Sequence, residues 1–189
     1  MSNTSDAMIW EKLSSKYLVK EQWATLRVDT CRLPDGQLID DYYVLEYPGW
    51  VNAIALTEDD KVILIRQYRH GAEKVMLELP GGCIDPGETP EEAMKRELLE
   101  ETGYEFDSIE PLGEVYANPS TSGNVTSSFL ATGGKKTQEQ HLDSREEIEV
   151  IIVSLDEFIK LAEENKFPHA LHVSTIFYGL LKLNKLRSC

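Results

Sequence analysis

The chain has 189 residues, of which 41% are hydrophobic and 28% are charged. These values are typical of a folded globular protein, and the length suits one large domain or one domain with a smaller extension. The formal net charge of −14 argues against binding to DNA, RNA or an anionic membrane, because their phosphate groups attract lysine and arginine.

The cysteines and the N-terminal sequence indicate where the protein resides. Cys31, Cys83 and Cys189 are widely spaced and form no Cys-x-x-Cys pair, so reduced thiols are expected rather than a zinc or redox site. No apolar run is long enough to cross a membrane, and the first residues lack the basic and apolar regions of a signal peptide. We therefore expect a cytoplasmic protein.

The first quarter of the chain has the pattern of β-strands. Residues 10–47 contain two strand-like runs on either side of the turn Pro34-Asp35-Gly36, in which glycine can adopt positive φ. Pro48-Gly49 interrupts the pattern. This predicts an N-terminal β extension over residues 1–49 and a second domain over residues 50–189.

The next segment predicts a hairpin, a short strand and then a helix. Two apolar runs within residues 50–69 flank the turn at residues 58–61, and residues 75–82 form a short strand that ends in Pro-Gly-Gly. Thr89 is a candidate N-cap, followed by Pro90 at the first helical position and by Glu92, which completes a capping box. Gly103 is a natural stop. We expect a helix from Pro90 to about Thr102.

The remaining elements alternate irregularly. Strands are expected within residues 109–118 and 127–134, on either side of a loop, and a polar loop then leads to a buried strand over residues 148–155. A helix follows a second capping box that starts at Ser154, and an amphipathic helix occupies residues 169–186. This order predicts a mixed α/β fold with helices packed on a mixed sheet, not a doubly wound sheet.

Three glutamates crowd one face of the first predicted helix. Glu97, Glu100 and Glu101 are spaced to converge, while Met94 and Leu98 anchor a neighbouring arc in the core. Like charges at this spacing repel, so the cluster is either an ordinary solvated surface or the site of a divalent cation. The preceding glycines and the nearby Arg96 favour the cation.

The whole segment resembles the Nudix box. The resemblance rests on the spacing G-x5-E-x7-R-E-L-x-E-E-x-G, which runs from Gly82 to Gly103. Its fixed positions between these glycines are Glu88, Arg96, Glu97, Leu98, Glu100 and Glu101. It implies the Nudix fold, an α/β/α sandwich around a mixed sheet, and hydrolysis of a nucleoside diphosphate linked to another group. It also implies Mg²⁺ or Mn²⁺ bound by Glu97, Glu100, Glu101 and the carbonyl of Gly81, with structural roles for Gly82, Glu88, Arg96 and Gly103. Glu97 and Glu101 are candidate catalytic residues.

Other segments resemble the ADP-ribose and nucleotide-sugar pyrophosphatase branch of that family. In "LIRQYRHG", Arg69 is a candidate phosphate clamp and Arg66 a weaker one. Glu78 of "ELPGG" would face the metal site or pair with an arginine. Pro119, 16 residues after Gly103, resembles a marker of ADP-ribose hydrolases, although the usual Ser-Pro-Gly is replaced here by "NPSTSGN".

This branch also implies a partner subunit and a catalytic base. In relatives the N-terminal β region exchanges with a second copy and helps to build the pocket for the adenine base of the substrate, so we expect a homodimer. A glutamate on a loop after the box often acts as the base, and Glu146, or else Glu147, lies where that loop is expected. Either could instead be a solvated loop charge.

The predicted function is metal-dependent hydrolysis of ADP-ribose or a related nucleoside diphosphate sugar to a nucleoside monophosphate and a sugar phosphate. One alternative is a Nudix hydrolase acting on NADH, dinucleoside polyphosphates or damaged nucleoside triphosphates. The other is a binding module that holds a nucleotide sugar without cleaving it, although such a module would be expected to have lost glutamates of the box.

Overall fold

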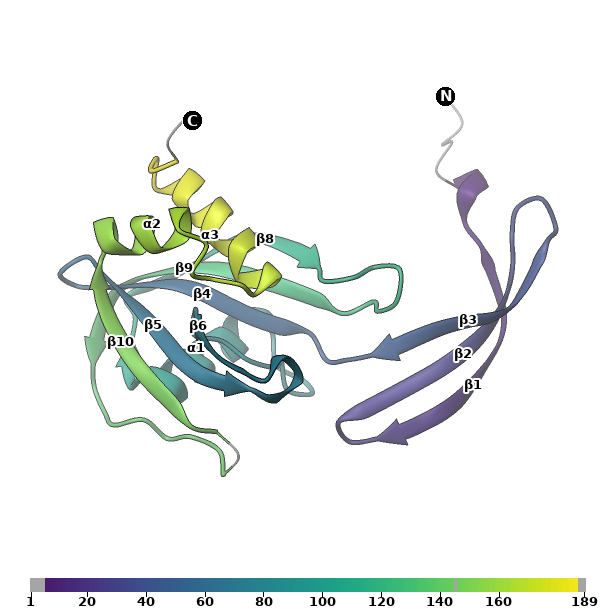
Figure 1. Ribbon diagram of the computed structural model, residues 1–189, viewed down its shortest axis with the longest axis horizontal. Helices are drawn as coiled ribbons and strands as arrows, with labels where there is room; N and C mark the ends of the chain where they lie inside the picture. The colour runs from purple at the N-terminus through teal and green to yellow at the C-terminus, as the bar shows by residue number, and fades with distance from the viewer. Residues whose placement is uncertain (1–5, 145, 187–189) are drawn as a thin grey trace. The chain divides into compact units, whose positions relative to one another are not determined.

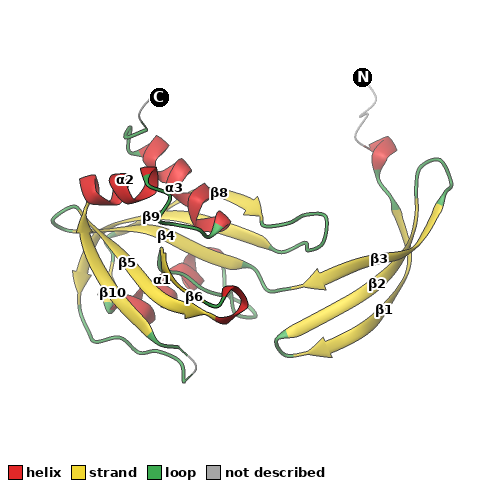
Figure 2. Ribbon diagram, in the orientation of Figure 1, coloured by secondary structure: helices red, strands yellow, loops and turns green. Residues whose placement is uncertain are grey.

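The computed structural model of the protein describes residues 6–144 and 146–186. The chain forms two compact units (Figures 1 and 2). The first comprises the chain up to Tyr47 together with Asn118–Asn124, and the second comprises Pro48–Ala117 and the chain from Val125 onward. No helix in the described ranges is long and apolar enough to cross a membrane.

The first unit is a three-stranded antiparallel sheet in the order β1-β2-β3, preceded by the short 3-10 helix η1 (Asp6–Met8). Its strands are β1 (Glu11–Glu21), β2 (Ala24–Arg32) and β3 (Leu38–Glu46). The turn predicted at Pro34-Asp35-Gly36 joins β2 to β3, with Gly36 at a φ of 88°. Every residue of β1 is exposed within the single chain, including Leu13, Leu18 and Val19. Such a sheet has little core of its own.

The loop Asn118–Asn124 is part of this first unit, which no pattern in the sequence indicates. The hydroxyl of Tyr42 donates to the carbonyl of Ser120 at 2.7 Å, and the backbone N–H of Leu45 donates to the carbonyl of Thr121 at 2.7 Å. These bonds attach the loop to β3. Pro119 therefore belongs to the first unit.

The second unit is built on a mixed seven-stranded sheet. Its main path runs β10-β5-β4-β9-β7, with β6 paired to β5 and β8 paired to β9, and β4 and β9 are its parallel pair. The strands are β4 (Trp50–Thr57), β5 (Lys61–Arg69), β6 (Lys74–Glu78), β7 (Tyr104–Glu105), β8 (Ser108–Tyr116), β9 (Val125–Lys136) and β10 (Ile148–Ser154). The short 3-10 helix η2 (His70–Ala72) joins β5 to β6.

Helices cover both faces of this sheet (Figure 1). Helix α1 (Pro90–Thr102) packs on one face through Met94 and Leu98, against a cluster that includes Ile63 and Phe129. Helices α2 (Leu155–Glu163) and α3 (Ala170–Lys182) pack on the other face, around Phe158, Phe167, Ile176 and Leu180. The predicted α/β/α sandwich around a mixed sheet is confirmed.

The sheet opens between β4 and β5 next to α1. The two strands pair only at Ala55–Ile63 and Leu56–Val62, and further along β5 its partner on that side is β6. The segment that follows β6 then bonds to the freed edge of β4, where the N–H groups of Ala53 and Val51 donate to the carbonyls of Pro80 and Gly82. The glycines of the box are thus held between the sheet and α1.

Several elements differ from expectation. The strand-like run before the turn at Pro34 forms two strands, β1 and β2, and the two-residue strand β7 was not predicted. Strand β9 continues to Lys136, through a segment predicted to be a polar loop, because Lys135 and Lys136 pair with β7. Strand β10 is less buried than its apolar sequence suggests, because it lies at the edge of the sheet and pairs with β5. Of the cysteines, Cys31 and Cys83 are free thiols, and Cys189 lies outside the described residues.

Candidate active site

Helix α1 begins and ends where the sequence predicts. The Thr89 hydroxyl accepts from the backbone N–H of Glu92, and the Glu92 carboxylate accepts from the backbone N–H of Thr89 at 2.8 Å, which completes the capping box. Gly103 ends the helix at a φ of 76°, and a Cβ there would clash with the carbonyl of Gln138. Because both ends are fixed, the glutamates of α1 face a defined point of the sheet.

Two of the three glutamates on this face are buried. Glu101 is 3% exposed and Glu97 is 9% exposed, whereas the Glu100 side chain is 41% exposed. The Glu101 carboxylate accepts a hydrogen bond from the backbone N–H of Gly81 at 2.8 Å. The acidic face of α1 therefore points at the glycine loop that fills the gap between β4 and β5.

Both loop glycines are needed for this close approach. A Cβ at Gly82 would clash with the carboxylate of Glu97, and a Cβ at Gly81 would clash with the backbone of Val51 and Asn52. The carbonyls of Pro80 and Gly82 accept from β4, and the N–H of Gly81 between them donates to Glu101 of α1. The carbonyl of Gly81 accepts no hydrogen bond from the described residues.

Arg96 connects the loop before α1 to three glutamates of the box. Its guanidinium donates to Glu88 at 2.8 and 2.9 Å, to Glu97 at 2.9 Å, to Glu100 at 3.1 Å and to the carbonyl of Cys83 at 2.9 Å. These charge-assisted bonds join α1 to the loop that precedes it. They also raise the pKa of Arg96 and lower the pKa of Glu88.

The buried carboxylates carry an electrostatic cost. Burial raises the pKa of Glu97 to about 7, opposed by Arg96 and reinforced by the charges of Glu100 and Glu146. Burial also raises the pKa of Glu101 well above its usual value, opposed by the N–H of Gly81 and reinforced by Glu97 and Glu146. A cation bound between these groups would favour their charged forms.

The donor set suits a hard divalent cation. Carboxylate oxygens and a free backbone carbonyl are the ligands that Mg²⁺ and similar ions prefer, and the absence of a side chain at Gly82 leaves room beside Glu97. Among the described residues, no group of three His, Cys, Asp or Glu side chains is already arranged as a ligand set. Arg96 instead engages the carboxylates of Glu97 and Glu100.

We expect the metal-free protein to lose stability as pH rises from 6 to 8. The folded-state pKa of Glu97 is raised to about 7, so folded protein binds more protons than unfolded protein in this window, and the stabilisation present at low pH is lost through pH 7. For Glu97 alone the loss is about 1.4 kcal/mol. Buried His172, whose pKa is lowered, acts with the opposite sign below about pH 6.5.

The measurement is the difference in the free energy of unfolding between wild type and Glu97→Gln. His172 contributes equally to both proteins, so its effect cancels in this difference. Urea unfolding in EDTA at pH 6 and at pH 8 should show that the variant gains on the wild type as pH rises. Equal pH slopes for the two proteins would contradict the proton uptake assigned to Glu97.

Arg69 lies beside the box glutamates, while Arg66 does not. On β5, Arg69 shares the face of Ile63, which packs in the α1 cluster, and its charge lowers the pKa of Glu101. Arg66 faces the opposite side and pairs with Glu149 of β10 at 2.8 Å in an exposed position. The two arginines thus stand on opposite faces of the sheet.

Glu78 holds Arg69 in place. Its carboxylate is 0% exposed and accepts from the Arg69 guanidinium at 2.6, 3.1 and 3.2 Å. Of the two alternatives that the sequence left open for Glu78, the structure shows the ion pair with an arginine. The Arg69 side chain is still 41% exposed, so part of the guanidinium remains accessible.

The two candidate bases differ in their relation to α1. Glu146 is exposed, its carboxylate accepts from the backbone N–H of Asp143 at 3.1 Å, and its charge raises the pKa of both Glu97 and Glu101. Glu147 is also exposed, and it is not among the main charges that shift either pKa. Pro119 lies in the first unit.

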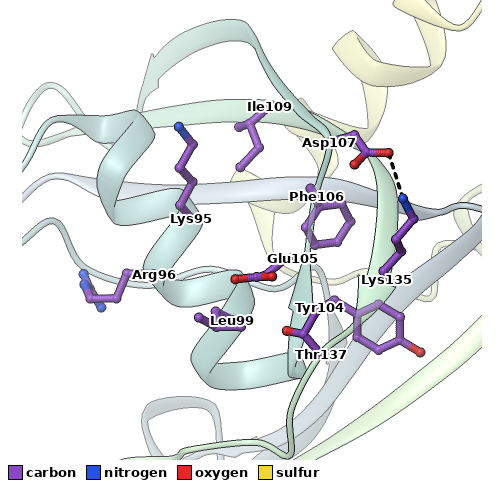
Figure 3. Close-up of a pocket in the computed structure, with 10 residues that line it drawn as sticks. All are labelled: Lys95, Arg96, Leu99, Tyr104, Glu105, Phe106, Asp107, Ile109, Lys135 and Thr137. Carbon is purple, nitrogen blue, oxygen red and sulfur yellow. Dashed lines mark hydrogen bonds and ion pairs between the residues drawn. The ribbon is translucent and has the colours of Figure 1, made fainter.

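A cavity of about 460 Å³ lies outside this site, between α1 and strands β7 to β9 (Figure 3). Its lining includes cationic side chains that are already paired: Lys95 with Glu91 at 2.8 Å, Lys135 with Asp107 at 3.4 Å, and Arg96 as described above. The buried glutamates of α1 do not line it. The cavity therefore shares Arg96 with the candidate active site but none of its buried glutamates.

The match to known families covers nearly all of the described chain. Residues 47–173 match the NUDIX domain, and residues 10–45 match the nucleoside diphosphate sugar hydrolase N-terminal domain. An ADP-ribose pyrophosphatase from Bacillus subtilis (strain 168) is 32% identical over 178 residues, which cover 91% of this chain and 96% of the relative.

Two further likenesses agree with this match. A methanol dehydrogenase activator from Bacillus methanolicus is 33% identical over 154 residues, which cover 81% of this chain and 83% of the relative. The crystal structure of an ADP compounds hydrolase superposes with a TM-score of 0.80 at 24% identity, covering 94% of this chain and 97% of the other, and shows the same fold. With its NUDIX domain and the glutamates of the box directed at Gly81, this chain belongs to the Nudix hydrolase family.

Proposed function

We propose that the chain hydrolyses the pyrophosphate bond of ADP-ribose or a related nucleoside diphosphate sugar, releasing a nucleoside monophosphate and a sugar phosphate. The observation that carries this proposal is the buried acidic pair Glu97 and Glu101 beside Gly81, with Arg69 nearby. The substrate class rests on the match of residues 10–45 and on the names of relatives of similar length.

Mg²⁺ or Mn²⁺ would be held by Glu97, Glu100, Glu101 and the carbonyl of Gly81. Such an ion neutralises pyrophosphate oxygens and lowers the pKa of a bound water. The chain contributes the rigid placement of these ligands, because α1 is capped at both ends and Arg96 fixes the outer carboxylates. Arg96 must yield part of its hold on Glu97 and Glu100 when they bind the ion.

Two charged side chains would act on the substrate and on water. Arg69, oriented by Glu78, is placed to bind a phosphate oxygen with the accessible part of its guanidinium. Glu146 is exposed and close enough to affect both buried glutamates, so it is our candidate for removing the proton of the attacking water. The attack on phosphorus breaks the bond to the bridging oxygen, which leaves with the sugar phosphate or the nucleotide.

The first unit is proposed to complete the enzyme as part of a homodimer. Its β1 exposes the apolar side chains of Leu13, Tyr17, Leu18 and Val19, and a three-stranded sheet of this kind gains stability by packing against another surface. Trp10 and Tyr42, whose ring centroids lie 5.7 Å apart in an edge-to-face arrangement, are candidates for contact with the nucleotide base of the substrate. Pro119 lies on the loop bonded to β3. We place this dimer in the cytoplasm.

A substrate panel with Mg²⁺ tests the proposal. ADP-ribose, ADP-glucose, GDP-mannose, NADH, a diadenosine polyphosphate and an oxidised deoxynucleoside triphosphate would be compared by kcat/KM, with products resolved by chromatography. We expect ADP-ribose or another nucleoside diphosphate sugar to give the highest value, with a monophosphate and a sugar phosphate as products.

The panel also separates the alternatives. Release of inorganic pyrophosphate from a triphosphate, at a higher kcat/KM than any sugar derivative, would identify a different nucleotide hydrolase. Tight binding of ADP-ribose without product, at any concentration of Mg²⁺ or Mn²⁺, would identify a binding module instead.

A further inference from the structure

A histidine of α3 reaches the glycine loop from the face of the sheet opposite α1. His172 is 6% exposed, and its Nδ1 accepts a hydrogen bond from the backbone N–H of Leu79 at 3.0 Å. Leu79 lies two residues before Gly81 and directly after Glu78, the partner of Arg69. The bond therefore fixes the backbone between the two charged parts of the candidate active site.

A second link from α3 supports the same backbone through β4. The hydroxyl of Thr175, one turn after His172, donates to the side-chain oxygen of Asn52 and lies 2.6 Å from the hydroxyl of Ser128, and all of these groups are buried. Asn52 packs against the loop so closely that its Cα would lie 2.7 Å from a Cβ at Gly81. Helix α3 thus supports Gly81 from behind at two points.

These links determine which backbone groups remain free for a ligand. The N–H of Leu79 is taken by His172, and the carbonyls of Pro80 and Gly82 are taken by β4. The N–H of Gly81 bonds to Glu101 of α1 at 2.8 Å, and the carbonyl of Gly81 accepts no hydrogen bond from the described residues. Without its bond to His172, the backbone at Leu79 would be free to shift and to carry Gly81 away from the glutamates.

We infer that His172 is a positioning residue for metal binding, which holds the Gly81 carbonyl in the ligand set from the opposite side of the sheet. The inference rests on the proposed metal site and adds a residue that lies 71 positions beyond Glu101 in the sequence. Glu101 of the box helix holds the N–H of Gly81 from one face of the sheet, whereas His172 holds the N–H of Leu79 from the other.

The state of the imidazole agrees with this role. Burial, with the nearby charges of His169 and Arg69, holds the pKa of His172 well below its usual value. The ring is then neutral at physiological pH, with its proton on Nε2 and a lone pair on Nδ1 toward Leu79. The alternative role is core packing alone, in which the acceptor atom would be irrelevant.

A matched pair of substitutions separates the two roles. In His172→Asn the side-chain oxygen takes the place of Nδ1 and can accept from Leu79, whereas in His172→Gln the oxygen lies near the position of Nε2 and cannot. Leu180→Ala, in the α3 core two turns away, controls for general loss of stability. Mn²⁺ binding to the purified full chain without substrate would be measured by the EPR signal of free Mn²⁺, alongside the melting temperature.

We expect His172→Gln to weaken Mn²⁺ binding by about 10-fold, as is typical when a residue that orients a metal ligand is changed. His172→Asn should retain most of the affinity, and Leu180→Ala should lower the melting temperature without changing the affinity. Similar Mn²⁺ affinities for His172→Gln, His172→Asn and wild type would overturn the inference. Equal losses of Mn²⁺ affinity in His172→Gln, His172→Asn and Leu180→Ala would also overturn it.

Glu101→Gln distinguishes failure of this inference from failure of the proposed metal site. If Glu101→Gln binds Mn²⁺ as well as wild type, the metal site itself is misplaced and the inference falls with it. If Glu101→Gln loses binding while His172→Gln does not, the metal site stands and His172 has a packing role only. Neither result depends on which nucleotide is the substrate.

Discussion

Replacing Glu101 with glutamine should abolish hydrolysis and raise the melting temperature of the metal-free protein. The Glu101 carboxylate is buried, and among described residues its hydrogen bond comes from the N–H of Gly81. Glutamine keeps the shape and can accept the same bond, but it removes a charge needed to bind a divalent cation. Activity depends on that charge, whereas folding without metal is hindered by it.

We expect kcat/KM with Mg²⁺ to fall by roughly 10³-fold, which corresponds to ~4 kcal/mol of transition-state stabilisation. In EDTA, relief of the buried charge should stabilise the variant by about 1 kcal/mol, or roughly 2–4 °C in melting temperature. Calorimetry with and without Mg²⁺ checks both parts, because added metal should stabilise wild type more than the variant. Near-normal activity in Glu101→Gln would remove this residue from the metal site.

Replacing Arg96 with alanine should damage both stability and activity. Its half-buried guanidinium bonds to Glu88, Glu97, Glu100 and the carbonyl of Cys83, so its loss leaves several acids close together without a cation. We expect a loss of about 2–3 kcal/mol in the free energy of unfolding, below the range for a fully buried pair because solvent reaches part of the group. Activity should fall by about 10²-fold or more, because the loop and the metal ligands lose their alignment.

Lys95 provides a matched control for Arg96 in the adjacent position of the same helix. Its ammonium pairs with Glu91 at 2.8 Å, with both side chains exposed. Lys95→Ala should cost less than about 0.5 kcal/mol and leave kcat/KM unchanged. Urea unfolding and steady-state kinetics would compare the free energy of unfolding and kcat/KM of Arg96→Ala and Lys95→Ala. Equal changes in the two variants would show that Arg96 is an ordinary surface cation.

The box helix could be predicted almost to the residue because its determinants are local. Thr89, Pro90, Glu92 and Gly103 set its ends through contacts within a few residues, and the structure places α1 at Pro90–Thr102. The spacing of the glutamates also follows from helix geometry. The sequence could not show that Glu97 and Glu101 are buried while Glu100 is only partly buried, since this depends on how α1 lies against the glycine loop.

Contacts between distant segments explain most of what the sequence left open. The pairing of Glu78 with Arg69 depends on the register of β5 and β6, and the separation of Arg66 from Arg69 depends on which face of β5 packs on α1. The loop that carries Pro119 joins β3 through bonds between residues 76 and 78 positions apart. No local pattern encodes such distances.

By itself, the sequence determined the α1 helix and the order of most strands and helices, because each depends on capping or periodicity over short stretches, and it predicted a metal-binding chemistry from the spacing of the glutamates. Only the tertiary structure decided how the site is assembled. The gap between β4 and β5, the bond from the Gly81 N–H to Glu101 and the bond from Leu79 to His172 arise when α1 and α3 pack on opposite faces of one sheet. Those contacts join residues up to 93 positions apart, and only the packed fold brings them within hydrogen-bonding distance.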